Sequence, residues 1–189
     1  MYPEYADVNG KLYKINTDYR VAIECDRIAR DETISDEERA LAVIYKLFGK
    51  EGIDNPQDYE TLLEKAKKYL LCGEELQEEN KEPDMDYIQD MKYIIPSFRS
   101  DYGIILNGYM HWWEFYSLLN GLSNSEFGNC CILNRIRNIR TMDTSGITDT
   151  KILKNIMEQK KKFALNKKKP TQEQLDSAKE FLKQMEGVI

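Results

Sequence analysis

The chain has 189 residues, of which 41% are hydrophobic and 32% charged, and its formal net charge is −6. This length and composition suit an apolar core with a well-solvated surface, so we expect residues 1–189 to form a single domain. No apolar run approaches the ~20 residues that span a bilayer, and the first residues lack the pattern of a signal peptide, so we expect no membrane partner. The four cysteines form neither a CxxC nor a zinc pattern, which favours reduced thiols.

The charge is unevenly distributed along the chain. Residues 132–169 carry 11 Lys and Arg against 3 acidic residues, a local charge of +8, whereas the remainder carries 16 basic and 30 acidic residues. The acidic residues concentrate in 74–90. Such polarity favours self-association, an oppositely charged partner, or an internal fit between the two halves, and these alternatives stay open.

The first predicted element is a β-hairpin over residues 5–15. Apolar residues alternate on both sides of Asn9-Gly10, the preferred pair for a tight hairpin turn. Helical spacing follows, with Asn16 or Thr17 as the first cap and these inward residues: Val21, Cys25, Ile28 and Ala29. A capping box at Ser35–Glu38 opens a second helix that ends at Gly49. Its predicted inward residues are Leu41, Ile44, Tyr45 and Phe48.

The middle of the chain predicts a third and a fourth helix on either side of an acidic loop. Asn55-Pro56 begins the third helix, and Gly73 stops it. We expect residues 74–86 to be a mobile loop. The fourth helix starts at about Tyr87, with a kink or break at Pro96, because proline removes a backbone donor. Its predicted inward residues are Ile88, Met91 and Ile95.

The remaining helices complete a mainly α prediction. A helix contains the segment GYMHWWEFYSLL, another spans about 124–139, and Thr148 and Thr171 are candidate caps for two more. The last helix, within 166–189, is expected to be loosely attached. The predicted fold is therefore a multi-helix bundle of about seven helices with a small N-terminal β-hairpin.

GYMHWWEFYSLL, residues 108–119, holds the only histidine and both tryptophans. On a helix, His111 and Trp112 fall within the apolar arc, whereas Trp113 lies at its edge. We expect His111 to be a buried imidazole bonded to a backbone carbonyl or a carboxylate, because no second histidine or nucleophile motif accompanies it. We expect Trp112 in the core, and Trp113 with Tyr109 either covered by another element or contacting a partner.

The basic region offers two interpretations. Arg135, Arg137 and Arg140 and the lysines after them could bind nucleic acid, or they could form a solvated helix face. Few aromatic residues are interleaved, and phosphate-binding fingerprints are absent, so nucleic acid is disfavoured. We expect no enzyme, no catalytic residue, no cofactor and no metal. The candidate protein-binding residues are Tyr109, Trp113, Arg135, Arg137 and Arg140.

Several segments together carry a family resemblance. They are residues 9–20, 101–104 with 109–122, Arg135-x-Arg137 with Met142-Asp143, and the stretch that ends at 161–165. In this order they resemble the gene product fifteen family of tailed phages and prophages of Gram-positive bacteria. The resemblance spans nearly the whole chain, and its most specific part is the hairpin combined with the tryptophan pair.

The resemblance implies a small protein of phage tail morphogenesis, encoded between the tail-tube and tape-measure genes. The implied function is that of a non-enzymatic tail assembly chaperone, which binds the tape-measure protein and assists tail-tube polymerisation. The implied partners are the tape-measure protein and the tail-tube protein, and a homo-oligomer stays open. The implied location is the cytoplasm of the bacterial host and not the mature virion. The alternatives are a nucleic-acid-associated phage protein using residues 132–169, or a structural virion component such as a connector.

Overall fold

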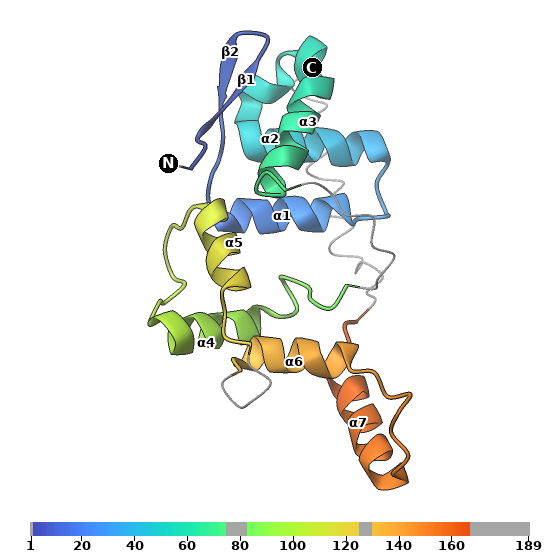
Figure 1. Ribbon diagram of the computed structural model, residues 1–189. Coiled ribbons are helices and arrows are strands. Elements are labelled where there is room, and N and C mark those ends of the chain that lie inside the picture. Colours follow the sequence, from blue (N-terminus) through green and yellow to red (C-terminus); the bar gives the residue numbers. More distant parts are fainter. Residues whose placement is uncertain (1, 75–82, 125–129, 167–189) are drawn as a thin grey trace.

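The computed structural model describes residues 2–74, 83–124 and 130–166 (Figure 1). Within these ranges the chain forms seven α-helices and one two-stranded sheet, which confirms the mainly α prediction with an N-terminal hairpin. The elements are β1 (Tyr5–Val8), β2 (Lys11–Lys14), α1 (Tyr19–Ala29), α2 (Asp36–Ile53), the 3-10 turn η1 (Pro56–Asp58), α3 (Tyr59–Leu70), α4 (Met91–Tyr102), α5 (Trp112–Asn120), α6 (Ile132–Thr141) and α7 (Thr150–Phe163).

The hairpin forms as predicted around Asn9-Gly10. Both residues have positive φ, 54° and 83°, as the tight turn requires. The strands pair in antiparallel register from Tyr5 opposite Lys14 to Val8 opposite Lys11. A two-stranded sheet is marginal alone, and this one packs its inner face against α2 and α3. The buried Tyr13 hydroxyl donates a hydrogen bond to the carboxylate of Asp58 at 2.7 Å, which fastens the hairpin to η1.

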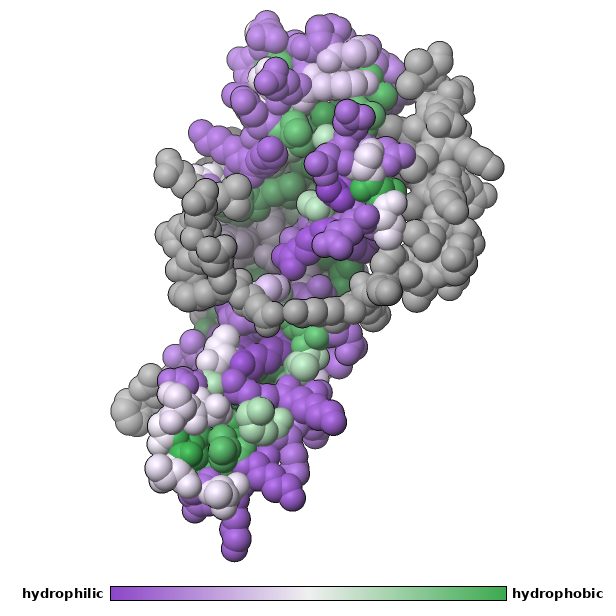
Figure 2. Space-filling view, turned by 90° about the vertical axis from the view of Figure 1, so that its right-hand side faces the viewer, coloured by the Kyte–Doolittle hydropathy of each residue, from purple (hydrophilic) through white to green (hydrophobic). Residues whose placement is uncertain are grey.

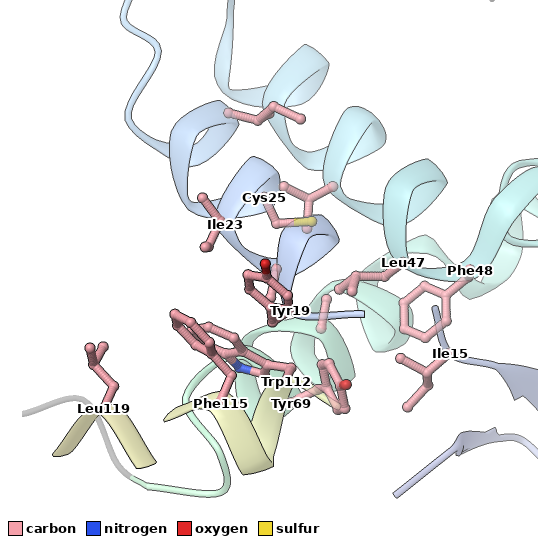
Figure 3. Close-up of a cluster of buried hydrophobic side chains, with 14 of the residues drawn as sticks. Ile15, Tyr19, Ile23, Cys25, Leu47, Phe48, Tyr69, Trp112, Phe115 and Leu119 are labelled. Atoms are coloured by element: carbon pink, nitrogen blue, oxygen red, sulfur yellow. The ribbon is translucent and has the colours of Figure 1, made fainter. Parts of the chain in front are cut away.

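The core lies where α1, α2, α3 and α5 meet (Figure 3). An aromatic stack joins three helices: Tyr19 of α1 lies 4.6 Å from Phe115 of α5, and Phe115 lies 5.2 Å from Phe98 of α4. Trp112 packs beside Phe115 at 5.8 Å. Aromatic side chains bury large apolar areas, so this stack connects the upper helices in Figure 1 to α4 below them.

Some predicted helix boundaries are confirmed and others shift. The capping box forms, because Ser35 accepts from the Glu38 N–H while the Glu38 carboxylate accepts from the Ser35 N–H. The cap of α1 is Asp18, whose carboxylate accepts from the Arg20 N–H, and not Asn16 or Thr17. Gly49 has φ 66° and interrupts α2, yet helical turns resume and continue to Ile53. Its positive φ breaks the helix geometry for one residue only.

Two predicted inward positions in the first two helices are wrong. Ala29 and Tyr45 are exposed. The buried stripe of α1 ends at Ile28, one residue before Ala29, and the stripe of α2 passes through Ile44, Leu47 and Phe48. In both cases the residue that was predicted to face inward lies just outside the apolar arc of the helix.

The prediction for α4 is wrong in phase. Ile88 and Ile95 are 48% and 41% exposed, whereas Ile94 and Phe98 are fully buried. The helix begins at Met91, four residues after the predicted start, so Ile88 lies outside it, and its buried stripe passes through Ile94 and Phe98. Pro96 does not break the helix, which continues to Tyr102. Pro96 and the residue four positions earlier are both exposed, so water can satisfy the carbonyl that the proline leaves without a donor.

The last described helices also begin later than predicted. Helix α6 starts at Ile132 with Cys131 as its cap, rather than near residue 124. The cap of α7 is Asp149, whose carboxylate accepts two backbone N–H groups, rather than Thr148. Helix α7 packs mainly against α6 and projects from the molecule (Figure 1). The predicted helix capped by Thr171, residues 167–189 and loop residues 75–82 lie outside the described residues.

Candidate protein-binding site

His111 is a structural residue at the N-terminus of α5. Its Nδ1 accepts a hydrogen bond from the Trp113 N–H at 3.1 Å, so the imidazole serves as the helix cap. Its Nε2 lies 3.2 Å from the Pro3 carbonyl oxygen and donates to it. The ring is buried and stacks with Tyr2 at 4.8 Å. The predicted buried imidazole bonded to a backbone carbonyl is confirmed.

The two tryptophans fasten α5 to the end of α3. The indole N–H of Trp112 donates to the Leu70 carbonyl, and that of Trp113 donates to the Tyr69 carbonyl, both at 3.0 Å. Carbonyls in the last turn of a helix lack intrahelical partners, so the adjacent indoles cap α3 from outside. Trp112 is 3% exposed, which confirms its place in the core. This paired capping explains why two tryptophans stand next to each other.

Trp113 is covered by the chain itself. Its ring is half-buried and lies 6.2 Å from the Tyr69 ring, and it reaches the turn at Gly73. Of the two alternatives for this edge residue, the structure therefore provides the first: α3 and the turn after it cover the ring. A contact between Trp113 and a partner stays a prediction.

Tyr109 differs from Trp113 in its surroundings. It lies before α5 and is 67% exposed, with its hydroxyl 2.7 Å from the Thr17 hydroxyl. At this place the N-termini of α1 and α5 are joined by two reciprocal backbone hydrogen bonds, Tyr19 N–H to Met110 and Trp112 N–H to Thr17. Tyr109 is therefore an exposed ring on a well-fixed junction, and its role in partner binding stays a prediction.

Arg140 forms a buried ion pair with Asp90. Two guanidinium nitrogens each lie 2.7 Å from a different carboxylate oxygen, and the side chains are only 10% and 1% exposed. Arg140 also donates to the backbone carbonyls of Asp84 and Phe163. One guanidinium thus holds together the segment before α4, the helix α6 and the end of α7. This fork geometry is specific to arginine.

The other two arginines occupy different environments. Arg137 pairs with Asp84 at 3.0 Å in a half-buried contact, whereas Arg135 is exposed. The three arginines that follow one another in the sequence therefore have different environments: two form internal ion pairs, and the third faces solvent. The predicted acidic loop is engaged here too, because its residues 83–86 meet α6 through Asp84. Partner binding by these arginines stays a prediction.

A shallow hollow of about 770 Å³ lies beside α4 and α6, with Tyr102, Asp101 and Cys130 in its wall. Burial would raise the pKa of Asp101, but hydrogen bonds from Ser123 and Ser100 outweigh it and lower the pKa. Burial raises the pKa of the Cys130 thiol, which disfavours its nucleophilic thiolate form. Among the described residues, no group of three His, Cys, Asp or Glu side chains converges as a metal site.

Helix α7 exposes apolar side chains that the sequence did not mark as a candidate contact surface. None of its residues is buried among the described part of the chain, and Ile152 and Met157 are 54% and 52% exposed. Its charged side chains are five lysines and one glutamate. An apolar helix edge with lysines beside it is a candidate contact surface. The signal in the sequence was one capped helix that combines the apolar Ile152 and Met157 with five lysines between Lys151 and Lys162.

The family model described as "Bacteriophage Gp15 protein" matches residues 2–165. The chain belongs to this family. The match covers all the described helices and ends two residues after α7. No curated protein and no solved structure matches the chain. None of the described helices is long and apolar enough to cross a membrane.

Proposed function

We propose that this phage protein is a tail assembly chaperone, which binds the tape-measure protein and assists polymerisation of the tail tube around it. In this proposal it is not an enzyme, acts in the cytoplasm of the bacterial host and is left out of the mature virion. Membership of the Gp15 family supports the phage context. The gene position that the family resemblance implies supports the tail assembly role.

The observation that carries the proposal is the projecting helix α7. A helix of 14 residues is marginal in water by itself, and its stability comes from packing of its apolar face. Helix α7 packs only in part on α6 and leaves apolar side chains in solvent. Such a helix edge suits the transient capture of an apolar stripe on another helix.

A pull-down tests the proposal directly. The tagged full chain is expressed in the same cell as the tape-measure protein of its own phage, and the captured material is identified by mass spectrometry. We expect the tape-measure protein to be retained, and the tail-tube protein to join it when all three are expressed. Absence of the tape-measure protein from the captured material would contradict the proposal.

Two alternatives have their own tests. A nucleic-acid-associated protein would bind duplex DNA with strong salt dependence, and neutralising Arg135 and Lys160 to Lys162 would abolish the binding. The internal pairing of Arg137 and Arg140 disfavours this alternative, because two of the cations are already neutralised. A connector would be found by mass spectrometry of purified virions, where a chaperone is expected to be absent.

A further inference from the structure

We propose that α7 presents a docking strip, formed by Lys154, Met157 and Lys161, for an amphipathic helix whose apolar stripe is flanked by acidic residues. The inference rests on the proposed function, since it names the surface and the chemistry by which this chain would hold a partner.

The strip follows from the helical positions of α7. Leu153, Ile156, Lys160 and Phe163 are the half-buried positions, and their spacing of three, four and three residues places them on one face. Because α6 is the main neighbour of α7, this face is directed toward α6. The three strip residues are exposed and follow one another at spacings of three and four residues on the adjoining face. The strip is about 10 Å long, from 1.5 Å of rise per residue.

The centre of the strip is apolar and accessible. Met157 is 52% exposed, although it continues the apolar arc that begins on the α6-facing side. Methionine is unbranched and adapts to irregular apolar surfaces, and it is common on surfaces that accept varied helices. Figure 2 shows hydrophobic residues on the projecting lower part of the molecule, which comprises α7 and the loop before it, among pale and hydrophilic ones. A docked helix would therefore remove apolar surface from water at this place.

The charges beside Met157 specify the partner. Lys154 and Lys161 lie about one turn before and after it, and the whole helix carries five lysines against Glu158. Opposite charges on two facing surfaces attract and suppress binding of like-charged partners, so the lysines on either side of Met157 favour a helix that carries acidic residues beside its apolar ones. At the other apolar edge, Asn155 and Gln159 bond to each other at 2.9 Å. Because this edge is uncharged, it would not distinguish an acidic partner helix from a basic one, as the lysines of the strip would.

Nucleic acid fits the strip less well than an acidic helix. Phosphate binding needs dense cationic groups, and here an apolar side chain separates the two lysines. Arginines, the preferred partners of phosphate, are not part of the strip, and Arg137 and Arg140 are engaged in ion pairs. The observations therefore favour a helix with both apolar and acidic side chains.

The test uses the full chain and three probes. The first probe is a synthetic helical peptide of about 21 residues with leucines at helical spacing and glutamates beside them. The second has lysines in place of the glutamates, and the third is a short DNA duplex. Fluorescence anisotropy at low and high salt measures binding. We expect the glutamate peptide to bind, more weakly at high salt, and the lysine peptide to fail.

Matched variants of α7 locate the site. We expect Lys154→Glu with Lys161→Glu to weaken binding of the glutamate peptide about tenfold, and Met157→Gln to weaken it as well. The controls are Lys162→Glu and Ile152→Gln, exposed residues that do not share the three- and four-residue spacing of the strip, and these variants should bind like the unchanged chain. Circular dichroism should report the same helix content for all of them, because no residue of α7 is buried among the described residues.

Four outcomes of these binding experiments would overturn the proposed strip, and a fifth comes from the pull-down. They are no binding of the glutamate peptide, tighter binding of the DNA duplex, equal losses in the control variants, and self-association of the chain that the double lysine variant alone abolishes. The last outcome, measured by light scattering, would make a second copy the occupant. If the tape-measure protein is still captured by the double lysine variant, the strip is wrong and the proposed function stands. Peptide binding without that capture supports the strip and contradicts the proposed function.

Discussion

The ion pair between Arg140 and Asp90 gives a quantitative prediction for stability. Replacing Arg140 with glutamine leaves a carboxylate that is 1% exposed without its counter-charge. Breaking a buried pair in this way costs about 3–5 kcal/mol of the free energy of unfolding. The carbonyls of Asp84 and Phe163 also lose a donor, which places the effect toward the upper end of that range. Total stability is about 5–15 kcal/mol, so the loss is a large fraction.

Urea unfolding followed by circular dichroism measures this loss. With a slope of about 2 kcal/mol per molar urea, the Arg140→Gln midpoint should fall by roughly 2 M. Arg135→Gln is the matched control on the same helix, and as an exposed change it should shift the free energy by no more than about 0.5 kcal/mol. Adding Asp90→Asn to Arg140→Gln removes the uncompensated charge and should restore part of the loss. An Arg140→Gln protein as stable as the Arg135→Gln control would show that the ion pair with Asp90 does not stabilise the fold.

Three further predictions concern the two tryptophans, two buried tyrosine hydroxyls and the pH dependence at Asp101. Trp112→Ala should cost about 3–5 kcal/mol of the free energy of unfolding, and Trp113→Phe, which keeps a ring but removes the indole donor, about 1 kcal/mol. If Trp113→Phe is as stable in urea as the unchanged protein, the hydrogen bond from Trp113 to α3 does not contribute to stability. Tyr69→Phe should leave stability unchanged or raised, because the buried Tyr69 hydroxyl has no hydrogen-bond partner among the described residues, whereas Tyr13→Phe removes a bond to Asp58 and should lower stability. Thermal melts compare the two variants, and a lower melting temperature for Tyr69→Phe than for Tyr13→Phe would contradict these hydrogen-bond assignments. Hydrogen bonds lower the pKa of Asp101 in the folded state, so its stabilising contribution is present above the unfolded pKa and is lost as pH falls through the folded pKa. The difference in the free energy of unfolding between Asp101→Asn and the unchanged chain should therefore shrink in acid, and a difference that grows in acid would contradict the lowered pKa.

Features set by neighbouring residues were predictable from the sequence. The hairpin needed only Asn9-Gly10 and alternating apolar residues, and the start of α2 needed only the Ser35–Glu38 box. Trp112 was correctly placed in the core because its apolar neighbours recur at helical spacing. In each case the pattern that gave the prediction joins residues a few positions apart, which a sequence can report.

Features set by distant residues were not predictable in the same way. Asp90 and Arg140 are 50 positions apart, and nothing local distinguishes that aspartate from the acidic residues before it. Trp113 looked like an edge residue because the carbonyl that it caps belongs to α3, 44 positions earlier. Ile88 was predicted inward because it was placed inside α4, which begins three residues after it, and the stripe drawn from it wrongly included Ile95. Tertiary contacts decided the first two cases.

The central proposal is that this chain binds the tape-measure protein through α7, and a chaperone bound in this way should keep that protein in solution. The most direct measurement is the fraction of tape-measure protein in the soluble extract. It is compared for the tape-measure protein expressed alone, with the full chain, with the Lys154→Glu and Lys161→Glu variant, and with the Lys162→Glu control. We expect a high soluble fraction with the full chain and with the control, and a low fraction with the variant or alone. The same low fraction with and without the full chain would contradict the proposed chaperone role.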